Sequence, residues 1–185
     1  MKNGNVFFLI GPRACGKTTL SYELSKELNC QTIDCDDCFT KKHARSIASY
    51  VESFGWEAFR KEESVILREI VEKAGSLPCL VVATGGGIVL QVKNRELMRS
   101  SGVVIYLSVP CHLLLERLLA SPLLEQRPSL TPLSLEEEVR KTMGEREPLY
   151  RETADYIVDA GRDRNDILED LVAIASGIAG KPCFF

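Results

Sequence analysis

Residues 11–18 carry the strongest chemical signal in the sequence. They read GPRACGKT, which fits the pattern G-x-x-x-x-G-K-[ST] between an apolar strand-like run and a helix-like stretch. In such a loop, glycines let successive backbone N–H groups converge on a phosphate, and the following helix directs its positive N-terminus at the same group. Lys17 is expected to reach the β- and γ-phosphates, and the Thr18 hydroxyl is expected to bind Mg²⁺. The pattern predicts a nucleoside triphosphate site and leaves the phosphoryl acceptor open.

Two carboxylates, Asp34 and Asp36, stand at the end of the second apolar run, in TIDCDD. A site of this kind needs an acid from a second strand to hold Mg²⁺. Residues i and i+2 on an extended segment point the same way, so both carboxylates are predicted to face one pocket. One would bind water on the metal, and the other would accept a hydrogen bond from an acceptor hydroxyl. The alternative is a polar turn in which Asp37 caps the following helix.

Three consecutive glycines, Gly85, Gly86 and Gly87, follow the third apolar run. Glycine costs backbone entropy there, so the triplet needs a reason. It predicts a backbone wall against which a small ligand lies closely. A tight turn between a strand and a helix is an equally good interpretation of the triplet alone.

The cysteines do not predict a metal or disulfide site. The chain has 7 of them, an odd and scattered set that is typical of a reducing compartment. Cys35 and Cys38 form one C-x-x-C pair, but a zinc site needs about four ligands, and His43 and His112 are isolated in the sequence.

The apolar runs alternate with stretches that have helical spacing, which predicts a parallel α/β sheet. Most of them are continuous in Val, Ile and Leu, as expected for strands covered on both faces. Residues 119–133 carry three prolines and are expected to form a mobile lid. The expected strands are Val6–Ile10, 32–36, 79–84, Val103–Ser108 and Tyr156–Asp159.

The composition limits the classes of function. A chain of 185 residues is expected to form one domain, 1–185. With 23 basic and 26 acidic residues the net charge is −3, which argues against a nucleic-acid partner, as does the 7% aromatic content. The first apolar run, Val6–Ile10, is too short for a signal peptide or membrane span. We therefore expect a cytoplasmic monomer that acts on small molecules.

Several motifs in this order resemble the shikimate kinases over nearly the whole chain. They are GPRACGKTT, IDCDD, GWEAFRKEE, ATGGGIVL, the pair Asn94-Arg95, GVVIYL, RPSL and REPLYRETAD. The form of the phosphate loop and the slightly long lid look most like the second bacterial isoform of that family. The resemblance implies a three-layer α/β/α P-loop fold of the nucleoside-monophosphate-kinase type. Its parts would be a five-stranded parallel sheet, a substrate-binding helical segment at about 37–73, and the lid.

The resemblance also implies an activity: MgATP-dependent phosphorylation of the 3-hydroxyl of shikimate, giving shikimate 3-phosphate and ADP on the route to chorismate and the aromatic amino acids. Matched by position, the metal residues are Thr18 and Asp34, and the catalytic residues are Lys17, Asp36 and Arg127. The ATP-binding residues are Gly11, Ala14, Cys15, Gly16, Lys17, Thr18, Thr19, Arg117 and Arg127. The residues that bind shikimate are Asp36, Arg60, Gly85, Gly86, Gly87 and Arg146.

The residue types suit this acceptor, a small ring with a carboxylate at one end and hydroxyls at the other. A planar guanidinium can bind a carboxylate through two hydrogen bonds, which suits Arg60 and Arg146. Three alternatives stay open. They are a kinase for another polyol acid such as gluconate, a nucleotide-dependent switch without an acceptor, and a module that binds ATP without transferring phosphate.

Overall fold

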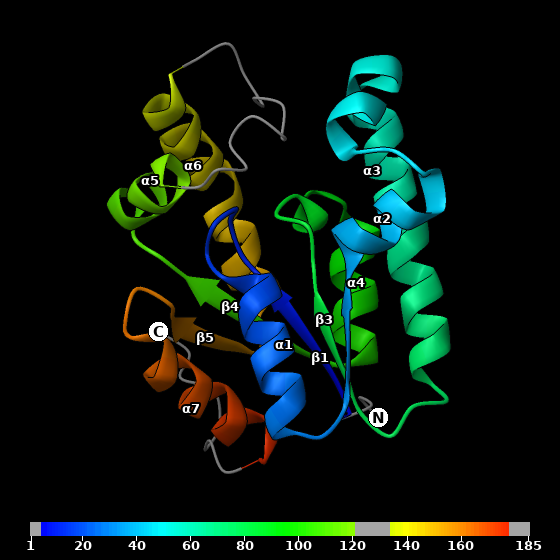
Figure 1. Ribbon diagram of the computed structural model, residues 1–185, viewed down its shortest axis with the longest axis vertical. Coiled ribbons are helices and arrows are strands. Elements are labelled where there is room, and N and C mark those ends of the chain that lie inside the picture. The colour runs from blue at the N-terminus through cyan, green and yellow to red at the C-terminus, as the bar shows by residue number, and fades with distance from the viewer. Residues whose placement is uncertain (1–4, 121–133, 178–185) are drawn as a thin grey trace.

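The computed structural model describes residues 5–120 and 134–177. Its strands are β1 (Val6–Ile10), β2 (Gln31–Asp34), β3 (Leu80–Ala83), β4 (Val103–Ser108) and β5 (Tyr156–Asp159). Its helices are α1 (Lys17–Glu27), α2 (Cys35–His43), α3 (Ile47–Ala74), α4 (Val92–Ser101), α5 (Cys111–Leu119), α6 (Leu135–Thr153) and α7 (Arg164–Ala175), with a short 3₁₀ turn η1 (Ile88–Leu90) (Figure 1).

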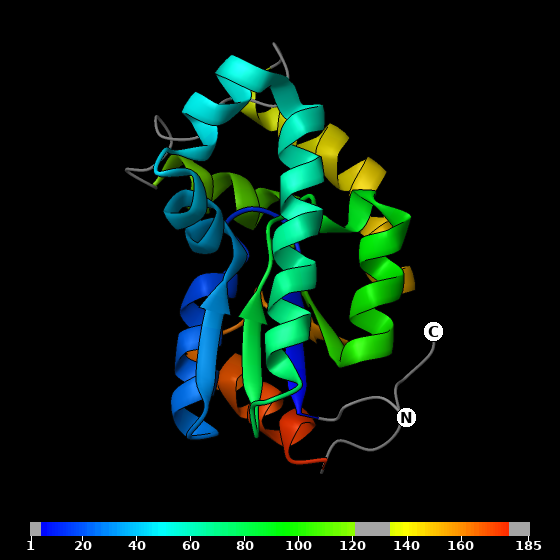
Figure 2. The same cartoon turned by 90° about the vertical axis from the view of Figure 1, so that its right-hand side faces the viewer.

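The five strands form one parallel sheet in the order β2-β3-β1-β4-β5. Helices α1 and α7 lie on one side of the sheet, and α3 and α4 lie on the other (Figures 1 and 2). The three-layer α/β/α fold expected from the sequence is therefore confirmed. The loops that follow β1, β2 and β3 all leave the carboxyl edge of the sheet, which is where ligands bind in open parallel sheets.

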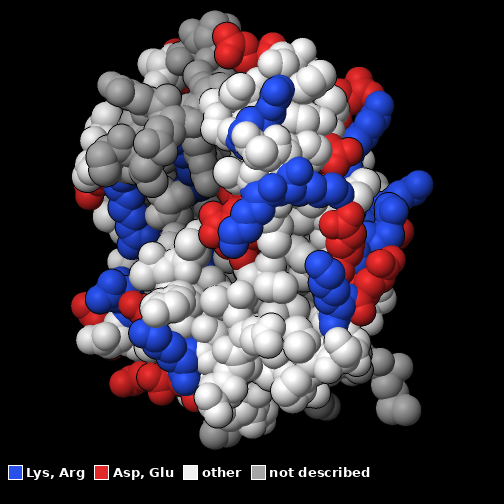
Figure 3. All heavy atoms as spheres, turned by 45° about the vertical axis from the view of Figure 1, so that its right-hand side comes forward, with Lys and Arg blue, Asp and Glu red and all other residues white. Residues whose placement is uncertain are grey.

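Helices α2 and α3 span most of residues 37–73, the segment that was expected to bind the substrate, and they pack through aromatic and charged pairs. The ring of Phe39 lies 4.9 Å from that of Phe59 and 5.0 Å from that of Tyr50. At the surface, Lys42 on α2 pairs with Glu69 on α3 at 2.7 Å. On this face of the molecule Lys and Arg side chains alternate with Asp and Glu (Figure 3). The segment is thus held as one unit beside the carboxyl edge of the sheet.

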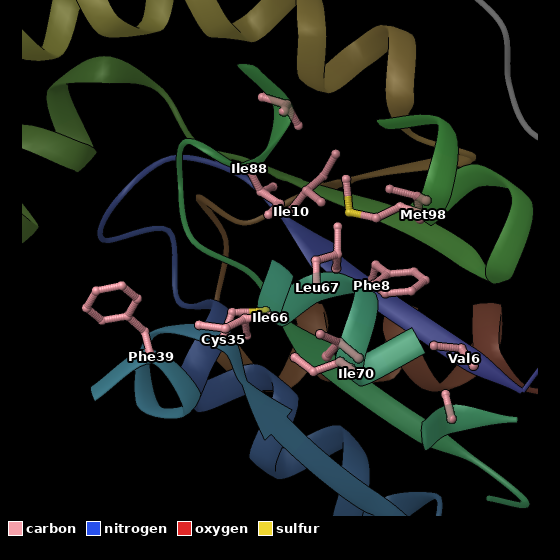
Figure 4. Packing of buried hydrophobic residues seen from close by; sticks show 14 of the residues in the cluster. Val6, Phe8, Ile10, Cys35, Phe39, Ile66, Leu67, Ile70, Ile88 and Met98 are labelled. Atoms are coloured by element: carbon pink, nitrogen blue, oxygen red, sulfur yellow. The ribbon is translucent and has the colours of Figure 1, made fainter. Parts of the chain in front are cut away.

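Strand β1 is buried along its whole length because apolar layers cover both faces of the sheet. Val6, Phe8 and Ile10 face the cluster that contains Ile66 on α3 and Met98 on α4 (Figure 4). The intervening residues of β1 belong to a second cluster with helices α1 and α7. This double coverage is what the continuous apolar run predicted, since a strand covered on one face only would alternate with polar residues.

One prediction about the carboxylates is wrong. Strand β2 ends at Asp34, so Asp36 lies in the first turn of α2 and the two residues do not share an extended segment. The Asp34 side chain accepts hydrogen bonds from the backbone N–H groups of Asp36, at 2.8 Å, and Asp37, at 3.4 Å. Asp34 rather than Asp37 therefore caps the helix, because its carboxylate pairs with N–H groups that lack partners within the helix.

The expected lid falls almost wholly between the two described parts of the chain. Helix α5 runs to Leu119, and α6 begins at Leu135 after a capping box between Ser134 and Glu137. Residues 121–133, with Arg127, lie outside the described residues. None of the helices in the described ranges is long and apolar enough to cross a membrane.

Candidate active site

The phosphate loop connects β1 to α1 through three residues with positive φ. These are Gly11 at 147°, Ala14 at 65° and Gly16 at 101°. A Cβ atom on Gly11 would lie 2.8 Å from the carbonyl oxygen of Leu107, so glycine is required there by space as well as by conformation. Gly16 stands at the N-cap position, so the first backbone N–H groups of α1 are not capped by its side chain. The loop is therefore shaped to bind an anion.

Lys17 is folded over this loop. Its Nζ atom donates to the carbonyl oxygens of Gly11, at 2.9 Å, and Pro12, at 2.7 Å, and lies 3.6 Å from the Sγ atom of Cys15. Cys15 is buried, with 1% of its surface exposed. The ammonium group of Lys17 thus lies next to the loop that is expected to hold the phosphates.

Thr18 and Asp34, the two predicted metal residues, are in contact at the start of α1. The Thr18 hydroxyl donates to Oδ2 of Asp34 at 2.7 Å, while Oδ1 of Asp34 caps α2. A hydroxyl and a carboxylate are hard oxygen donors of the kind that Mg²⁺ binds, and both are next to the phosphate loop. Their types and position fit a magnesium ion.

A pocket lies between α3 on one side and α5 and α6 on the other, and residues of the phosphate loop also line it. One part of its wall is polar and the other is apolar. The charged lining consists of Arg13, Asp36, Arg60, Glu63, Glu138 and Arg146, and the apolar lining includes Leu114, Leu118, Val139 and Met143. The structure therefore brings Asp36, Arg60 and Arg146, three of the residues predicted to bind the substrate, to one pocket from three different helices.

Arg60 is held by an ion pair that the sequence reasoning missed. Its Nη1 atom donates to Oε2 of Glu63 at 2.7 Å, and its guanidinium carbon lies 5.3 Å from the Trp56 ring and 5.1 Å from the Phe59 ring. Burial raises the pKa of Glu63, and Arg60 offsets part of this effect. The available signal was the spacing in FRKEE, because an arginine and a glutamate three residues apart on a helix are neighbours.

The three glycines leave room for the site's own polar groups. A Cβ on Gly85 would lie 2.5 Å from Oε1 of Glu63, and one on Gly87 would overlap the guanidinium of Arg60. A Cβ on Gly86 would lie 3.4 Å from the backbone nitrogen of Arg13 in the phosphate loop. Glycine is therefore required at Gly85 and Gly87 by the side chains of Glu63 and Arg60, and the role of the triplet as a wall against a ligand stays a prediction.

Two buried polar atoms in this pocket have no hydrogen-bond partner among the described residues. They are Oε1 of Glu63, an acceptor, and Nε of Arg146, a donor. Leaving such atoms unpaired costs about 1–3 kcal/mol each. A ligand with both a carboxylate and hydroxyl groups has the partners that these atoms lack, since a carboxylate accepts from guanidinium and a hydroxyl donates to a carboxylate.

A family model described as shikimate kinase matches residues 13–175. The chain belongs to the shikimate kinase family. Shikimate kinase 2 of Enterobacter sp. (strain 638) is 45% identical over 165 residues, covering 89% of this chain and 92% of the relative. Shikimate kinase 2 of Escherichia fergusonii is 41% identical over 172 residues, covering 93% and 92%. The resemblance to the second bacterial isoform is thereby confirmed.

Solved structures agree with this assignment to the shikimate kinases. A shikimate kinase from Acinetobacter baumannii in complex with shikimate superposes with a TM-score of 0.86, at 31% identity, over 97% of each chain. A gluconokinase from Sinorhizobium meliloti 1021 has a TM-score of 0.55 at 13% identity, over 97% of this chain and 95% of that one, which shows a shared fold alone. The kinase activity and ATP as co-substrate follow from the family.

Arg117, matched to the nucleotide side of the shikimate kinase site, lies beside the phosphate loop. Its guanidinium donates to the carbonyl oxygens of Ala160, at 2.9 Å, and Ala14, at 3.5 Å. It therefore joins the loop before α1 to the loop before α7. Of the residues predicted for this site, Arg127 alone falls outside the described ranges.

Proposed function

We propose that the chain transfers the γ-phosphoryl group of ATP to the 3-hydroxyl of shikimate, using the pocket between α3, α5 and α6 for the acceptor. The observation that carries this proposal is the meeting of a phosphate loop with a pocket lined by three arginines and three acids. That set matches a small acid with hydroxyl groups at the end opposite its carboxylate.

Arg60 and Arg146 are the residues proposed to bind the carboxylate of shikimate. Arg60 is fixed by Glu63 at 2.7 Å, and Arg146 is held by its bond from Nη1 to the carbonyl oxygen of Gly86, at 3.3 Å. Both guanidinium groups are therefore oriented before the substrate arrives, which reduces the entropy lost on binding. The N–H group at Nε of Arg146, which has no partner among the described residues, is then proposed to donate a hydrogen bond to the substrate carboxylate.

Asp36 is proposed to hold the hydroxyl that receives the phosphoryl group. It lines the pocket from the first turn of α2, next to the phosphate loop, and Glu63 lines the same polar part of the wall. A carboxylate that accepts the hydroxyl hydrogen bond aims the oxygen at the γ-phosphorus. Phosphoryl transfer has a loose transition state, so this positioning matters more than early removal of the proton.

Lys17 and Arg127 are proposed to neutralise the charge that develops on the transferred group. Thr18 and Asp34 are proposed to hold Mg²⁺, which supplies charge neutralisation to the phosphates of ATP when it is bound. Residues 119–133 are proposed to act as the lid that excludes water while the phosphoryl group moves.

A coupled assay of ADP release, run with shikimate, with gluconate and with no acceptor, tests the function. Release that depends on shikimate, with shikimate 3-phosphate as the product, is expected. Release that responds to gluconate alone would favour a kinase for another polyol acid. Nucleotide binding without release under any condition would favour a switch or a binding module.

We also propose that the enzyme is one domain that works as a monomer in the cytoplasm, on small molecules and not on nucleic acid or membranes. The net charge of −3 argues against a nucleic-acid partner, as does the mixture of Lys and Arg with Asp and Glu along the right-hand side of the face in Figure 3. Light scattering on the purified chain is expected to give the mass of a single chain. A dimer mass would contradict the monomer.

A further inference from the structure

Two cysteines stand side by side at the amino ends of adjacent strands, at the edge of the sheet opposite the phosphate loop. In the parallel register of β2 and β3, Gln31 pairs with Leu80, so Cys30 and Cys79 are the residues just before that pair. Figure 2 shows the two strands running next to each other. Adjacent strands are about 4.8 Å apart, which lies within the Cα separation of about 4.4–6.8 Å that a disulfide spans.

The side chains of Cys30 and Cys79 lie on the same face of the sheet. Both pack against the apolar cluster that contains Val81 of β3 and Leu24 of α1. The Cys30 thiol donates to the carbonyl oxygen of Gln31 at 3.6 Å, and the neighbouring thiol of Cys79 helps to raise the pKa of Cys30. Both residues are free thiols and both are partly exposed, so a small reagent can reach them.

The remaining described cysteines lack this combination. Cys15 and Cys35 are buried, and Cys111 is exposed on α5, far along the chain from either strand end. Cys38 is partly exposed on α2. Within the described ranges, Cys30 and Cys79 are therefore the pair that combines neighbouring positions on adjacent strands with access from solvent.

We propose that Cys30 and Cys79 are a redox modification site, which a low-molecular-weight disulfide such as oxidised glutathione converts into a disulfide. The thiolate of Cys79 attacks one sulfur of the oxidant, forms a mixed disulfide and releases one glutathione thiolate, which takes up a proton. Cys30 then loses its proton and attacks the Cys79 sulfur, and the second glutathione leaves. Two protein thiols are oxidised, and one molecule of oxidised glutathione is reduced to two thiols.

The order of the two steps follows from the surroundings of Cys30. Burial, together with the neighbouring thiol of Cys79, raises the pKa of the Cys30 thiol to about 12. Since the thiolate is the attacking species, Cys79 reacts first with the oxidant. The parallel register places Cys30 and Cys79 at neighbouring strand positions, a separation that a disulfide can span.

The disulfide would close a loop that contains all of α2 and α3. That loop carries Asp36, Arg60 and Glu63 of the acceptor pocket. A cross-link restricts the unfolded chain and stabilises the folded one, and it would also fasten the edge strand β2 to its only neighbour in the sheet order. The phosphate loop and the acceptor pocket lie at the carboxyl edge of the sheet, whereas the two cysteines lie at its amino edge. The disulfide therefore forms without blocking the pocket.

Peptide mapping of the full chain after incubation with oxidised glutathione tests the proposal. Free thiols are alkylated, the protein is digested with trypsin, and disulfide-linked peptides are found by mass spectrometry. The tryptic peptide 74–93 holds Cys79 as its one cysteine, whereas peptide 27–41 holds Cys30, Cys35 and Cys38. Fragmentation of the linked pair is expected to place the bond at Cys30.

Variants and melting curves complete the test. In the Cys30→Ser variant, the reaction is expected to end at a stable mixed disulfide on Cys79. The Cys111→Ser variant is expected to form the cross-link as the wild type does. The melting temperature of the oxidised wild type should rise by roughly 5–10 °C over the reduced protein, and that of Cys30→Ser should not rise. A wild-type chain in which Cys79 stays free, keeps its glutathione, or links to Cys35 or Cys38 would overturn the proposal.

Discussion

The hydroxyl of Tyr150 donates a hydrogen bond of 2.5 Å to the carbonyl oxygen of Gly86. The tyrosine is fully buried on α6, one helical turn after Arg146, whose guanidinium donates to the same carbonyl at 3.3 Å. One backbone oxygen of the glycine wall is thus shared by a structural side chain and a residue proposed to bind the substrate. The position of the wall and the orientation of Arg146 are therefore coupled.

Tyr150→Phe tests this coupling. Removing the hydroxyl leaves the Gly86 carbonyl with the longer bond from Arg146, so we expect a loss of about 1–3 kcal/mol in unfolding free energy. The KM for shikimate should rise several-fold while the KM for ATP stays near its wild-type value. Tyr106→Phe is the matched control, because Tyr106 stacks on Tyr150 with ring centroids 5.0 Å apart. Equal changes in both KM values would contradict the link to the acceptor pocket.

Arg146→Ala is expected to raise the KM for shikimate by about 10- to 100-fold. The reason is the loss of charge-assisted hydrogen bonds to the substrate carboxylate, worth about 1.5–3 kcal/mol. Arg140→Ala on the same helix is the control, since Arg140 is exposed and pairs with Glu136 at 2.7 Å. Steady-state kinetics with varied shikimate measures both. A similar KM in the two variants would remove Arg146 from the site.

Glu63→Gln should change how stability depends on pH. Burial raises the pKa of Glu63 above its usual 4.5, so the folded chain holds this proton more tightly than the unfolded chain. The stability that the protonated group contributes is present below 4.5 and is lost as the pH rises through the folded pKa. The glutamine variant cannot ionise there. The unfolding free energy of the variant, relative to that of the wild type, should therefore increase as the pH rises.

Urea unfolding of the wild type and Glu63→Gln at several pH values measures this difference. Glu72→Gln is the control, because Glu72 is exposed on the same helix. The KM for shikimate of Glu63→Gln should also rise, since Arg60 loses its charged partner. A difference in unfolding free energy that does not change with pH would show that Glu63 titrates normally.

Lys17→Ala should lower the turnover number by about 10²–10³, because one preorganised cation at a transferring phosphate contributes about that much. Its melting temperature should change little, since Lys17 bonds only to loop carbonyls and Cys15 in this structure. Lys26→Ala on the same helix is the control, because that side chain lies over the exposed ring of Tyr22. An unaltered turnover number in Lys17→Ala would refute the role of the phosphate loop.

Asp34→Asn separates the two roles of Asp34. Asparagine caps a helix as well as aspartate does, so the fold should be kept. It lacks the negative charge that attracts a cation, so the Mg²⁺ concentration needed for half-maximal rate should rise by about tenfold or more. A titration of the rate with Mg²⁺ at saturating ATP and shikimate measures this. An unchanged Mg²⁺ requirement would place the metal away from Asp34.

The phosphate loop and the strands could be predicted from the sequence because each depends on residues close together in the chain. The phosphate loop needs four residues in one short segment, Gly11, Gly16, Lys17 and Thr18. The strands can be recognised as continuous apolar runs. Strands Val6–Ile10, Val103–Ser108 and Tyr156–Asp159 have the predicted bounds. The family resemblance added Arg60 and Arg146, which no local pattern marks as ligands.

The tertiary structure decided what depends on contacts between distant segments. It ended β2 at Asp34, because that carboxylate caps α2 and turns the chain, so Asp36 reaches the pocket from a helix and not from a strand. It brought Tyr150 to Gly86 across 64 positions of sequence, and Cys30 to Cys79 through the parallel register of β2 and β3. Such pairs follow from sheet order and helix packing, which hydrophobic periodicity does not specify. The residue types alone determined the chemistry that was available, and the packing decided which groups share a site.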